Sequence, residues 1–261
     1  MNHPAFLNHS FKGRRLDTGN SMKNDLEMRH FPDCGPHFDG RSESWASYYA
    51  PGGEMVGRLT RIVKQLKKRI PKGSRILDFG CGTGNIAAEC GKEGYKVDAV
   101  DRSMRMVEHA GSSFRIEGVD FSFCANPLQL EFADGTFDAI IASSVLEYVV
   151  PLHAQLKELH RVCKDRGVSL ITVPNMGHPI RWFEAVERCL VVPIIDRLRG
   201  SWREREEYLL LSANRQSIRE WRECFARAGW LVITMEQRFR TLTLIVAEKR
   251  TTVAANCAIS V

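Results

Sequence analysis

Short apolar runs alternate with longer runs of helical periodicity along most of this sequence, and this alternation limits the possible folds most strongly. The run from Ala139 to Ala142 is apolar at every position, so a strand there would be buried on both faces. Strands of this kind occur in parallel sheets that helices cover on both sides. The last two predicted strands are so close in sequence that they should pair antiparallel. The sequence therefore predicts a doubly wound α/β fold with a seven-stranded, mostly parallel sheet and an antiparallel last strand; the expected strands are 74–79, 95–101, 119–125, 137–145, 167–175, 230–237 and 241–249.

The pattern also suggests a division of the chain. Residues 1–42 show no sustained apolar period, so we expect a flexible leader or a loose lid there, followed by a single domain over 43–261. Helical, aromatic-bearing sequence interrupts the alternation at 177–211, which we interpret as a helical cap insertion over a substrate. No window reaches the ~20 consecutive apolar residues of a membrane span, and the N-terminus lacks an apolar signal core, so we expect a cytoplasmic protein.

The positive charge is concentrated in one predicted helix. The net charge is +6, and the stretch from Arg58 to Arg75 holds eight Lys and Arg residues and no acidic residue. Such a face would suit a nucleic-acid backbone, but a solvated amphipathic helix accounts for it as well. The eight cysteines are scattered singly, without the spacing of metal ligands, so no metal site is predicted.

The sequence ILDFGCGTGN, Ile76 to Asn85, passes from a buried strand into a helix through three glycines. Glycines at such a turn let a ligand approach the main chain, where the amides of the helix N-terminus face it. The spacing is G-x-G-x-G, and Asn85 stands where the dinucleotide fingerprint has its third glycine. Asp101 ends the next predicted strand, where a carboxylate can accept both hydroxyls of a ribose. Together the glycine turn and Asp101 indicate a site for an adenosyl ligand or a dinucleotide. The alternative for the glycines is a tight turn that holds no ligand, and the alternative for Asp101 is an acid that only precedes a helix.

Three segments carry a resemblance to a known family. ILDFGCGTGN, VDAVDRSMRMVEHA and FCANPLQLEFADGTFDAIIASSVLEYV, in this order and spacing, resemble the class I S-adenosylmethionine-dependent methyltransferases. The similarity is greatest to the small-molecule group that includes coenzyme Q-type O-methyltransferases, and it covers Arg75 to Asn175. It implies a Rossmann-like methyltransferase fold, S-adenosylmethionine as the cofactor and S-adenosylhomocysteine as the product.

The resemblance implies how the methionine and ribose parts of the cofactor are held. Asp78 and the loop from Gly80 to Gly84 would hold the methionine moiety, with backbone groups meeting its ammonium and carboxylate. Asp101 would bind the ribose hydroxyls. Similar enzymes close an N-terminal helix over the cofactor, which adds Tyr49 to the site.

The adenine side follows from the same resemblance. Arg102 and Met106 would flank the base. Asn126 stands where the family usually has an Asp that accepts from the adenine amino group, and an Asn oxygen can also accept. The full set of predicted cofactor-binding residues is Asp78, Gly80, Cys81, Gly82, Gly84, Asp101, Arg102, Met106, Asn126, Ser143 and Tyr49.

Two residues are candidates for catalysis. The stretch SSVLEYV follows the fourth strand and should line the rim around the sulfonium. Relatives often show Glu-His where this chain has Glu147 and Tyr148, which puts in doubt any metal or base role borrowed from that His. Tyr148 is one candidate, with a packed core aromatic as the alternative. His178, just beyond the fifth strand, is the preferred general base, with a solvated loop histidine as the alternative.

Aromatic residues gather in SWASYYA and in the cap insertion. They either form an apolar acceptor pocket or attach the cap to the sheet; they are Trp45, Tyr48, Tyr49, Trp182, Phe183, Trp202 and Tyr208. The sequence as a whole predicts a methyltransferase that acts on a hydroxyl or phenol oxygen of a small molecule, as a monomer or homodimer, without a nucleic-acid partner. The alternatives are N-methylation of a small molecule, nucleic-acid methylation through the basic helix, a non-catalytic binding protein and a dehydrogenase.

Overall fold

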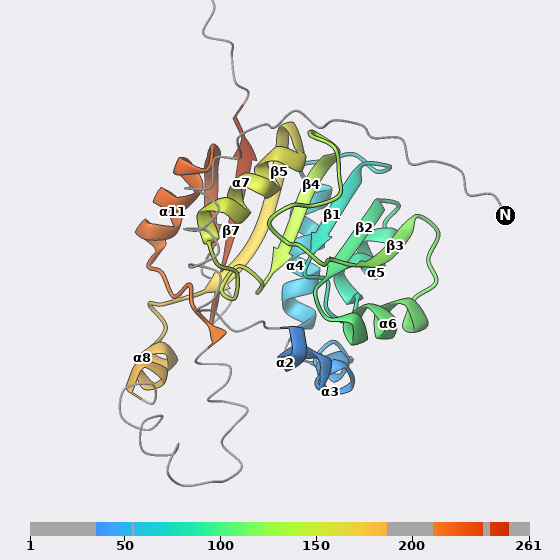
Figure 1. Ribbon diagram of the computed structural model, residues 1–261, viewed down its shortest axis with the longest axis horizontal. Coiled ribbons are helices and arrows are strands. Elements are labelled where there is room, and N and C mark those ends of the chain that lie inside the picture. The colour runs from blue at the N-terminus through green and yellow to red at the C-terminus, as the bar shows by residue number, and fades with distance from the viewer. Residues whose placement is uncertain (1–34, 54, 187–210, 237–240, 251–261) are drawn as a thin grey trace, which may run out of the picture. The chain divides into compact units, whose positions relative to one another are not determined.

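A seven-stranded sheet, in the order β3-β2-β1-β4-β5-β7-β6, forms the centre of the protein (Figure 1). The computed structural model describes residues 35–53, 55–186, 211–236 and 241–250, all within one compact unit, Asp33–Val261. The strands are β1 Arg75–Phe79, β2 Lys96–Asp101, β3 Val119–Phe123, β4 Phe137–Ser143, β5 Cys163–Pro174, β6 Trp230–Glu236 and β7 Leu242–Lys249. Strands β1 to β5 pair in parallel, and β7 pairs antiparallel with β5 and β6. The predicted fold is therefore confirmed.

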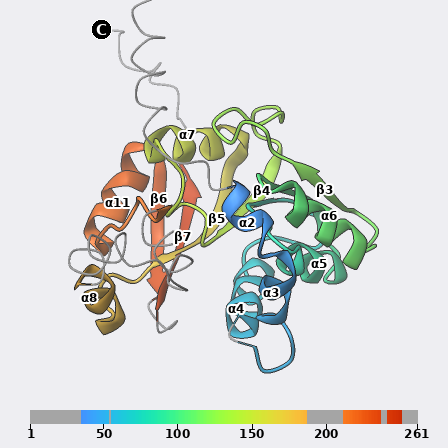
Figure 2. The same ribbon diagram turned by 60° about the horizontal axis from the view of Figure 1, so that its bottom comes forward.

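Helices cover both faces of this sheet (Figure 2). The described helices are α2 Gly35–Asp39, α3 Ser42–Ser47, α4 Val56–Lys67, α5 Asn85–Lys92, α6 Met104–Ser113, α7 Leu152–Val162, α8 Pro179–Val186 and α11 Ile218–Arg227. In β4, Ala139 and Ile141 pack with α4 and α5, whereas Ile140 and Ala142 pack with α7 and α11. All four side chains are fully buried, which confirms the expectation from their uninterrupted apolar run.

Strand β5 begins earlier than predicted. The preceding helix α7 ends at Val162, and the backbone of Cys163 is already extended, with a ψ of 140°. Arg166 then adopts a left-handed φ of 61°. A Cβ on the next residue, Gly167, would lie 2.6 Å from the Cys163 sulfur, so the chain bends tightly within β5 at a position that needs glycine.

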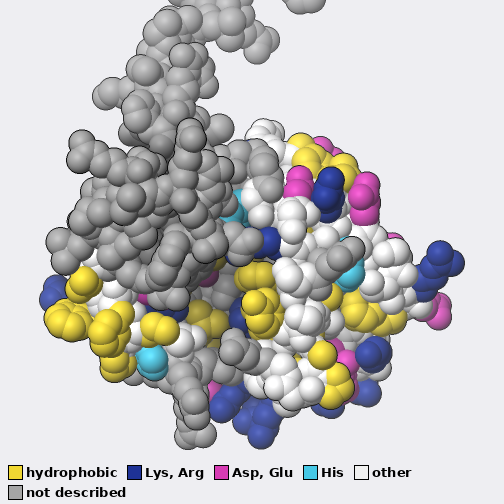
Figure 3. Space-filling model, turned by 90° about the horizontal axis from the view of Figure 1, so that it is seen from below, with side chains coloured by type: hydrophobic (Ala, Val, Ile, Leu, Met, Phe, Trp, Pro, Cys, Tyr) yellow, Lys and Arg dark blue, Asp and Glu magenta, His cyan; other side chains and the backbone are white. Residues whose placement is uncertain are grey.

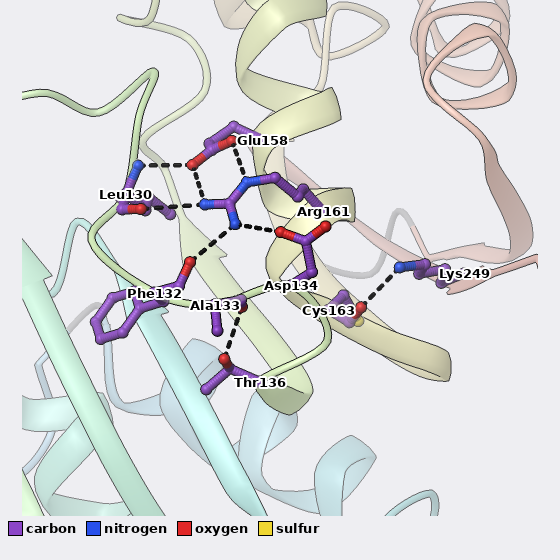
Figure 4. A network of polar contacts seen from close by, with 9 residues as sticks. All are labelled: Leu130, Phe132, Ala133, Asp134, Thr136, Glu158, Arg161, Cys163 and Lys249. Carbon is purple, nitrogen blue, oxygen red and sulfur yellow. Dashed lines mark hydrogen bonds and ion pairs between the residues drawn. The ribbon is translucent and has the colours of Figure 1, made fainter.

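The long loop between β3 and β4 is fixed by Arg161 of α7 (Figure 4). The Arg161 guanidinium donates to the carbonyl oxygens of Leu130 at 3.0 Å and Phe132 at 2.8 Å. It also forms ion pairs with Asp134 at 2.6 Å and Glu158 at 2.7 Å. The loop on the adenine side of the predicted site is therefore attached to the helix layer by several charge-assisted hydrogen bonds.

The basic residues between Arg58 and Arg75 do not form a uniform solvated face. Three of them pair with acids from other elements, namely Arg61 with Glu236, Lys67 with Glu93 and Arg75 with Asp98. Arg58 points to the carboxyl end of β4 instead of to solvent. Five of the eight, Lys64, Lys67, Lys68, Lys72 and Arg75, are exposed, so the stretch is largely a solvated face with Arg58 as the exception, and its ion pairs leave less unpaired charge for a nucleic-acid backbone.

The domain division stays a prediction. Helix α2 lies inside the predicted leader of residues 1–42. Of the predicted cap insertion, 177–211, the structure describes 177–186 and Leu211, so Trp202 and Tyr208 lie outside the described residues. Within the described ranges, no helix is long and apolar enough to cross a membrane.

Candidate active site

The glycine loop after β1 adopts backbone conformations that favour glycine. Gly80, Gly82 and Gly84 have φ values of 73°, 54° and 79°. A Cβ on Gly80 would lie 2.3 Å from a methyl group of Val145, and one on Gly84 would lie 2.7 Å from the Phe121 ring. Close packing within the protein thus accounts for two of the three glycines, in addition to any ligand that the loop holds.

Asp78 of β1 is a buried carboxylate beside this loop. Burial raises its pKa to about 7, and the nearby negative charge of Asp101 adds to the shift, while a hydrogen bond from the Ala87 backbone opposes it. Its Oδ2 atom has no hydrogen-bond partner among the described residues. A buried carboxylate oxygen with an open acceptor position is suited to an ammonium group.

Asp101 ends β2 and is held by the backbone. It accepts from the Gly82 N–H at 2.8 Å and from the Ser103 N–H at 2.8 Å, one on each oxygen. Burial raises the pKa of Asp101 against these hydrogen bonds. The Arg102 N–H also interacts with this carboxylate and lowers its pKa, and the oriented carboxylate keeps acceptor capacity for ligand hydroxyls.

Arg58 is a site residue that the sequence interpretation missed. From the first turn of α4, its Nη1 donates to the side-chain oxygens of Ser144 at 2.9 Å and Ser143 at 3.3 Å. Within the described part of the chain it forms no ion pair with a carboxylate. A signal was present, because Arg58 stands four residues before Ile62 and therefore on the buried stripe of α4.

The end of β4 has a strained backbone. Ser144 adopts a φ of 58°, which is uncommon outside glycine. Its N–H is directed at Thr172 of β5, 3.1 Å from the carbonyl oxygen and 2.9 Å from the hydroxyl oxygen. The Ser143 and Thr172 hydroxyl oxygens are 3.3 Å apart. Strain of this kind concentrates at functional sites, and here it presents hydroxyl groups beside the Arg58 guanidinium.

Tyr49 and Cys81 lie in the same region. Burial raises the pKa of the Tyr49 hydroxyl, the Arg58 charge opposes the shift, and Asp78 adds to it. One hydroxyl is thus near both the cation and the buried acid. Burial also raises the pKa of the Cys81 thiol, so we expect a neutral thiol here and no thiolate nucleophile.

Glu147 forms a second buried charged group near this end of the sheet. Burial raises its pKa to about 7, against the attraction of Arg181, Arg58 and Arg215. The Ser212 hydroxyl donates to it at 3.4 Å. Arg181 of α8 and Arg215 both pair with Glu184, so the group links the loop after β4 to helix α8.

The two predicted catalytic residues lie in neighbouring loops. His178 follows β5, and its Nδ1 accepts from the Ile180 N–H at 3.3 Å, so this nitrogen caps the start of α8. Tyr148 is half-buried, and its ring meets that of Phe38 edge-on at 5.3 Å between centroids. The catalytic role of each stays a prediction.

Helix α8 has an unusual distribution of polar and apolar side chains. Its charged residues Arg181 and Glu184 are buried, whereas Trp182 and Phe183 are 70% and 62% exposed. Apolar side chains accordingly gather at the α8 side of the face shown in Figure 3. The two rings meet edge-on at 5.9 Å between centroids and are largely exposed, which does not favour the alternative that they attach the cap to the sheet.

The three residues predicted for the adenine side differ in exposure. Met106 is buried, and its N–H donates to the Ser103 hydroxyl, which caps α6. Arg102 and Asn126 are exposed. The Asn126 side-chain oxygen accepts from the Leu128 N–H at 3.1 Å, which leaves one acceptor position for a ligand. Among the residues that the structure describes, no three His, Cys, Asp or Glu side chains are grouped so that they could hold a metal ion.

The fold and the site define a class of protein. Acids end the neighbouring strands β1 and β2, with a glycine turn between β1 and α5, as in Rossmann-like proteins that bind an adenosyl cofactor at the carboxyl ends of parallel strands. The chain belongs to the methyltransferase domain family, whose model matches residues 52–235.

Curated relatives and solved structures agree with this assignment. Over 168 residues the chain is 32% identical to the demethylmenaquinone methyltransferase of Corynebacterium urealyticum, which covers 63% of this chain and 68% of the relative. Over 120 residues it is 28% identical to the ubiquinone biosynthesis O-methyltransferase of Rickettsia prowazekii, covering 45% of this chain and 48% of the relative. The phosphoethanolamine N-methyltransferase 2 of Haemonchus contortus, solved with S-adenosyl-L-methionine, shares the fold with a TM-score of 0.63; its identity is 17%, and the match covers 82% of this chain and 57% of that one.

The protein is therefore a methyltransferase of the small-molecule type that uses S-adenosylmethionine. Three features fit that cofactor: the Asp78 oxygen that has no hydrogen-bond partner among the described residues, the oriented carboxylate of Asp101, and the Arg58 guanidinium, which has no carboxylate partner in the same part of the chain.

Proposed function

We propose that the chain transfers the methyl group of S-adenosylmethionine to a hydroxyl or phenol oxygen of a small molecule. The observation that carries this proposal is the polar group at the end of β4, where Arg58 meets the hydroxyls of Ser143 and Ser144. The two serine hydroxyls, which Arg58 holds in place, can donate to an acceptor oxygen whose negative charge grows as its proton leaves. The relative that is named for O-methylation supports the choice of oxygen.

The charges around Tyr49 match the methionine end of the cofactor. Asp78 would accept from its ammonium through the unpaired Oδ2, and Arg58 would pair with its carboxylate. Arg58 contacts the end of β4, and Asp78 lies near the end of the neighbouring strand β1, so both charges are at the same edge of the sheet, as a zwitterion requires. Asp101 would accept the two ribose hydroxyls on its remaining lone pairs.

The other predicted residues complete this arrangement. The backbone of Gly80, Cys81 and Gly82 would line the path between the methionine and the ribose. Met106 would contribute an apolar contact and Asn126 an acceptor on the adenine side.

The chain's own contribution to the reaction is orientation, exclusion of water and removal of a proton. When bound, the cofactor supplies an electrophilic methyl group on a positively charged sulfur. Displacement at that carbon needs an aligned acceptor in a dry site more than covalent help from the protein. An oxygen acceptor must also lose its proton, and His178 is the proposed base. In the neutral ring the Nδ1 that accepts from the Ile180 N–H holds the lone pair and Nε2 carries the hydrogen, so His178 would take the proton on Nδ1 after releasing the Ile180 N–H.

The test uses cofactor that is isotopically labelled in its methyl group. The full chain is incubated with it and with demethylated hydroquinones, simple phenols and the matching anilines, and the methylated atom is identified by mass spectrometry and NMR. Label on oxygen is the expected result, reduced by His178→Ala. Label on nitrogen or carbon alone, or label transferred only to RNA or DNA, would overturn the proposal while leaving the family assignment intact.

A further inference from the structure

Two arginines share one carboxylate where helix α8 meets the segment that precedes α11. Arg181 of α8 donates from Nη1 to both oxygens of Glu184, at 2.9 and 2.8 Å, and Nη2 of Arg215 pairs with the same acid. Arg181 and Arg215 expose only 6% and 11% of their side chains. Because arginine keeps its proton in proteins, the single charge of Glu184 cannot neutralise both guanidinium groups.

Arg215 has a guanidinium nitrogen that the protein does not use. Its Nη1 atom is buried and has no hydrogen-bond partner in the part of the chain that the structure describes. Burying a donor without an acceptor costs free energy, and the cost is greater when the group is charged. The two N–H bonds on this nitrogen are therefore suited to a ligand that brings a negatively charged oxygen.

Arg215 lies beside the loop after β4. The residue before it, Asn214, donates from its side-chain amide to the carbonyl oxygens of Leu146 at 2.7 Å and Val149 at 2.6 Å. Both carbonyl groups belong to the loop that begins with the strained Ser144, whose hydroxyl is part of the proposed acceptor site. The backbone before Arg215 is thus fixed to that loop by hydrogen bonds.

Arg181 lies beside the loop after β5. Its backbone N–H donates to the carbonyl oxygen of His178, the proposed base, at 2.9 Å. Its Nη2 donates at 3.0 Å to the carbonyl oxygen of Thr241, which also accepts from the Asn175 N–H at 2.8 Å. The arginine pair, Arg181 and Arg215, is therefore placed next to the loops at the carboxyl ends of β4 and β5, the edge of a parallel sheet at which ligands bind.

The buried acid of this group supplies only part of a compensating charge. Arg181, Arg215 and Arg58 all act on Glu147. Burial nevertheless raises the pKa of Glu147 to about 7, so a fraction of the molecules carry it uncharged at neutral pH. Since Arg58 is assigned to the carboxylate of the cofactor, the positive charge of the arginine pair remains for a second ligand.

We propose that the acceptor carries a carboxylate in addition to the oxygen that is methylated, and that Arg215 binds this carboxylate through Nη1. The inference rests on the proposed oxygen methylation and names the class of its substrate, a hydroxylated organic acid. The carboxylate supplies the negative charge that Glu184 alone cannot provide to the arginine pair. It also orients the acceptor, because binding at one end of the molecule limits the positions of the hydroxyl at the other.

The experiment compares hydroxylated acids with their primary amides, which keep the shape and lose the charge. The full chain is incubated at neutral pH with methyl-labelled S-adenosylmethionine and with mono- and dihydroxylated benzoates and cinnamates, each beside its amide. Mass spectrometry gives kcat/KM for methylation of the hydroxyl oxygen. The native chain should prefer the acid over its amide by about tenfold or more, the strength of a charge-assisted hydrogen bond. This comparison needs no variant.

Variants assign the preference to one residue. Arg215→Gln should lower kcat/KM for the acids about tenfold or more and for the amides much less. Arg215→Lys keeps the charge without the planar fork, so it should keep part of the preference. Arg219→Gln is the matched control, because Arg219 is exposed on α11 and pairs with Glu223 at the surface, and it should match the native chain.

The possible failures of the inference and of the proposed function differ. Equal methylation of acids and amides by the native chain would overturn the carboxylate site and leave oxygen methylation intact. An equal loss with acids and amides in Arg215→Gln, with S-adenosylhomocysteine binding unchanged, would show that Arg215 only supports α8. Label in a methyl ester would also overturn the inference, since the carboxylate would then be the methylated group. Absence of label on oxygen in every acid and amide would overturn the proposed function, and the inference with it.

Discussion

The backbone N–H of Gly82 donates to the Asp101 carboxylate across 2.8 Å, which joins the glycine loop after β1 to the acid that ends β2. Together with the hydrogen bond from Ser103, this fixes the carboxylate before any ligand binds. An acceptor that is oriented in advance loses little entropy on binding, so its hydrogen bonds contribute more fully to affinity. The glycine loop and the Asp101 carboxylate, which form two parts of the predicted cofactor site, are thus positioned relative to each other before the cofactor binds.

Replacing Asp101 should weaken cofactor binding without unfolding the protein. Asp101→Ala removes the proposed acceptor of both ribose hydroxyls, and we expect at least a tenfold rise in the dissociation constant for S-adenosylmethionine, about 1.4 kcal/mol or more. Isothermal titration calorimetry measures this, with NAD as the non-cognate ligand. Asp98→Ala is the matched control, because Asp98 lies on the same strand in a partly exposed ion pair with Arg75. An equal loss in both variants would contradict a ribose-binding role.

The role of Arg58 can be tested by removing the group that it is proposed to bind. The native chain should prefer S-adenosylmethionine over its decarboxylated analogue by about tenfold or more, the strength of a charge-assisted hydrogen bond. Arg58→Gln should abolish that preference by weakening only the carboxylate-bearing ligand. Arg61→Gln, one turn along α4 and paired with Glu236, should keep it. If Arg58→Gln still prefers S-adenosylmethionine over the decarboxylated analogue, Arg58 does not bind the cofactor carboxylate and is left to contact the acceptor.

Features that depend on local sequence were predictable, and features that depend on distant contacts were not. The burial of Ala139 and Ile140 on opposite faces follows from neighbouring residues alone, as does the position of Asp101 at a strand end. The hydrogen bond from Arg58 to Ser144 joins residues 86 positions apart, and no local pattern encodes it. The same holds for Glu147, because the arginines whose charges act on it come from distant positions in the sequence.

Gly80→Ala should destabilise the fold, whatever the protein binds. The residue has a φ of 73°, and a Cβ would lie 2.3 Å from a Val145 methyl carbon, so we expect a loss of about 1–3 kcal/mol in the free energy of unfolding. The double variant Gly80→Ala, Val145→Ala should recover the stability lost through the clash with Val145, but not the stability lost through the positive φ of residue 80. Gly111→Ala is the control, since nothing lies within 4 Å of a Cβ there and alanine favours the helix. Urea unfolding measures all four chains.

Cofactor affinity should depend on pH through Asp78. Its pKa is raised to about 7, so it is mostly protonated at pH 6 and cannot then pair with an ammonium group. Affinity for S-adenosylmethionine should therefore rise roughly five- to tenfold between pH 6 and pH 7.5. Asp78→Asn should bind weakly and show only the pH dependence of the ligand itself. Parallel pH profiles for the two chains would contradict a role for the ionised carboxylate.

Glu147 should make the stability of the folded protein depend on pH in the opposite sense to an ordinary carboxylate. Its pKa is about 7 in the folded chain, against about 4.3 for an unfolded glutamate, so the folded state binds the proton more tightly. The stability that this contributes is fully present below about pH 4.3 and is lost as the pH rises to about 7. The free energy of unfolding of Glu147→Gln, relative to that of the native chain, should therefore increase by about 2–4 kcal/mol between pH 4.5 and pH 7.5, and level off above that. Chemical denaturation of both chains across this range measures the difference, in which the contributions of Asp78 and Asp101 cancel. A difference that is constant with pH would show that Glu147 stays ionised inside its group of arginines.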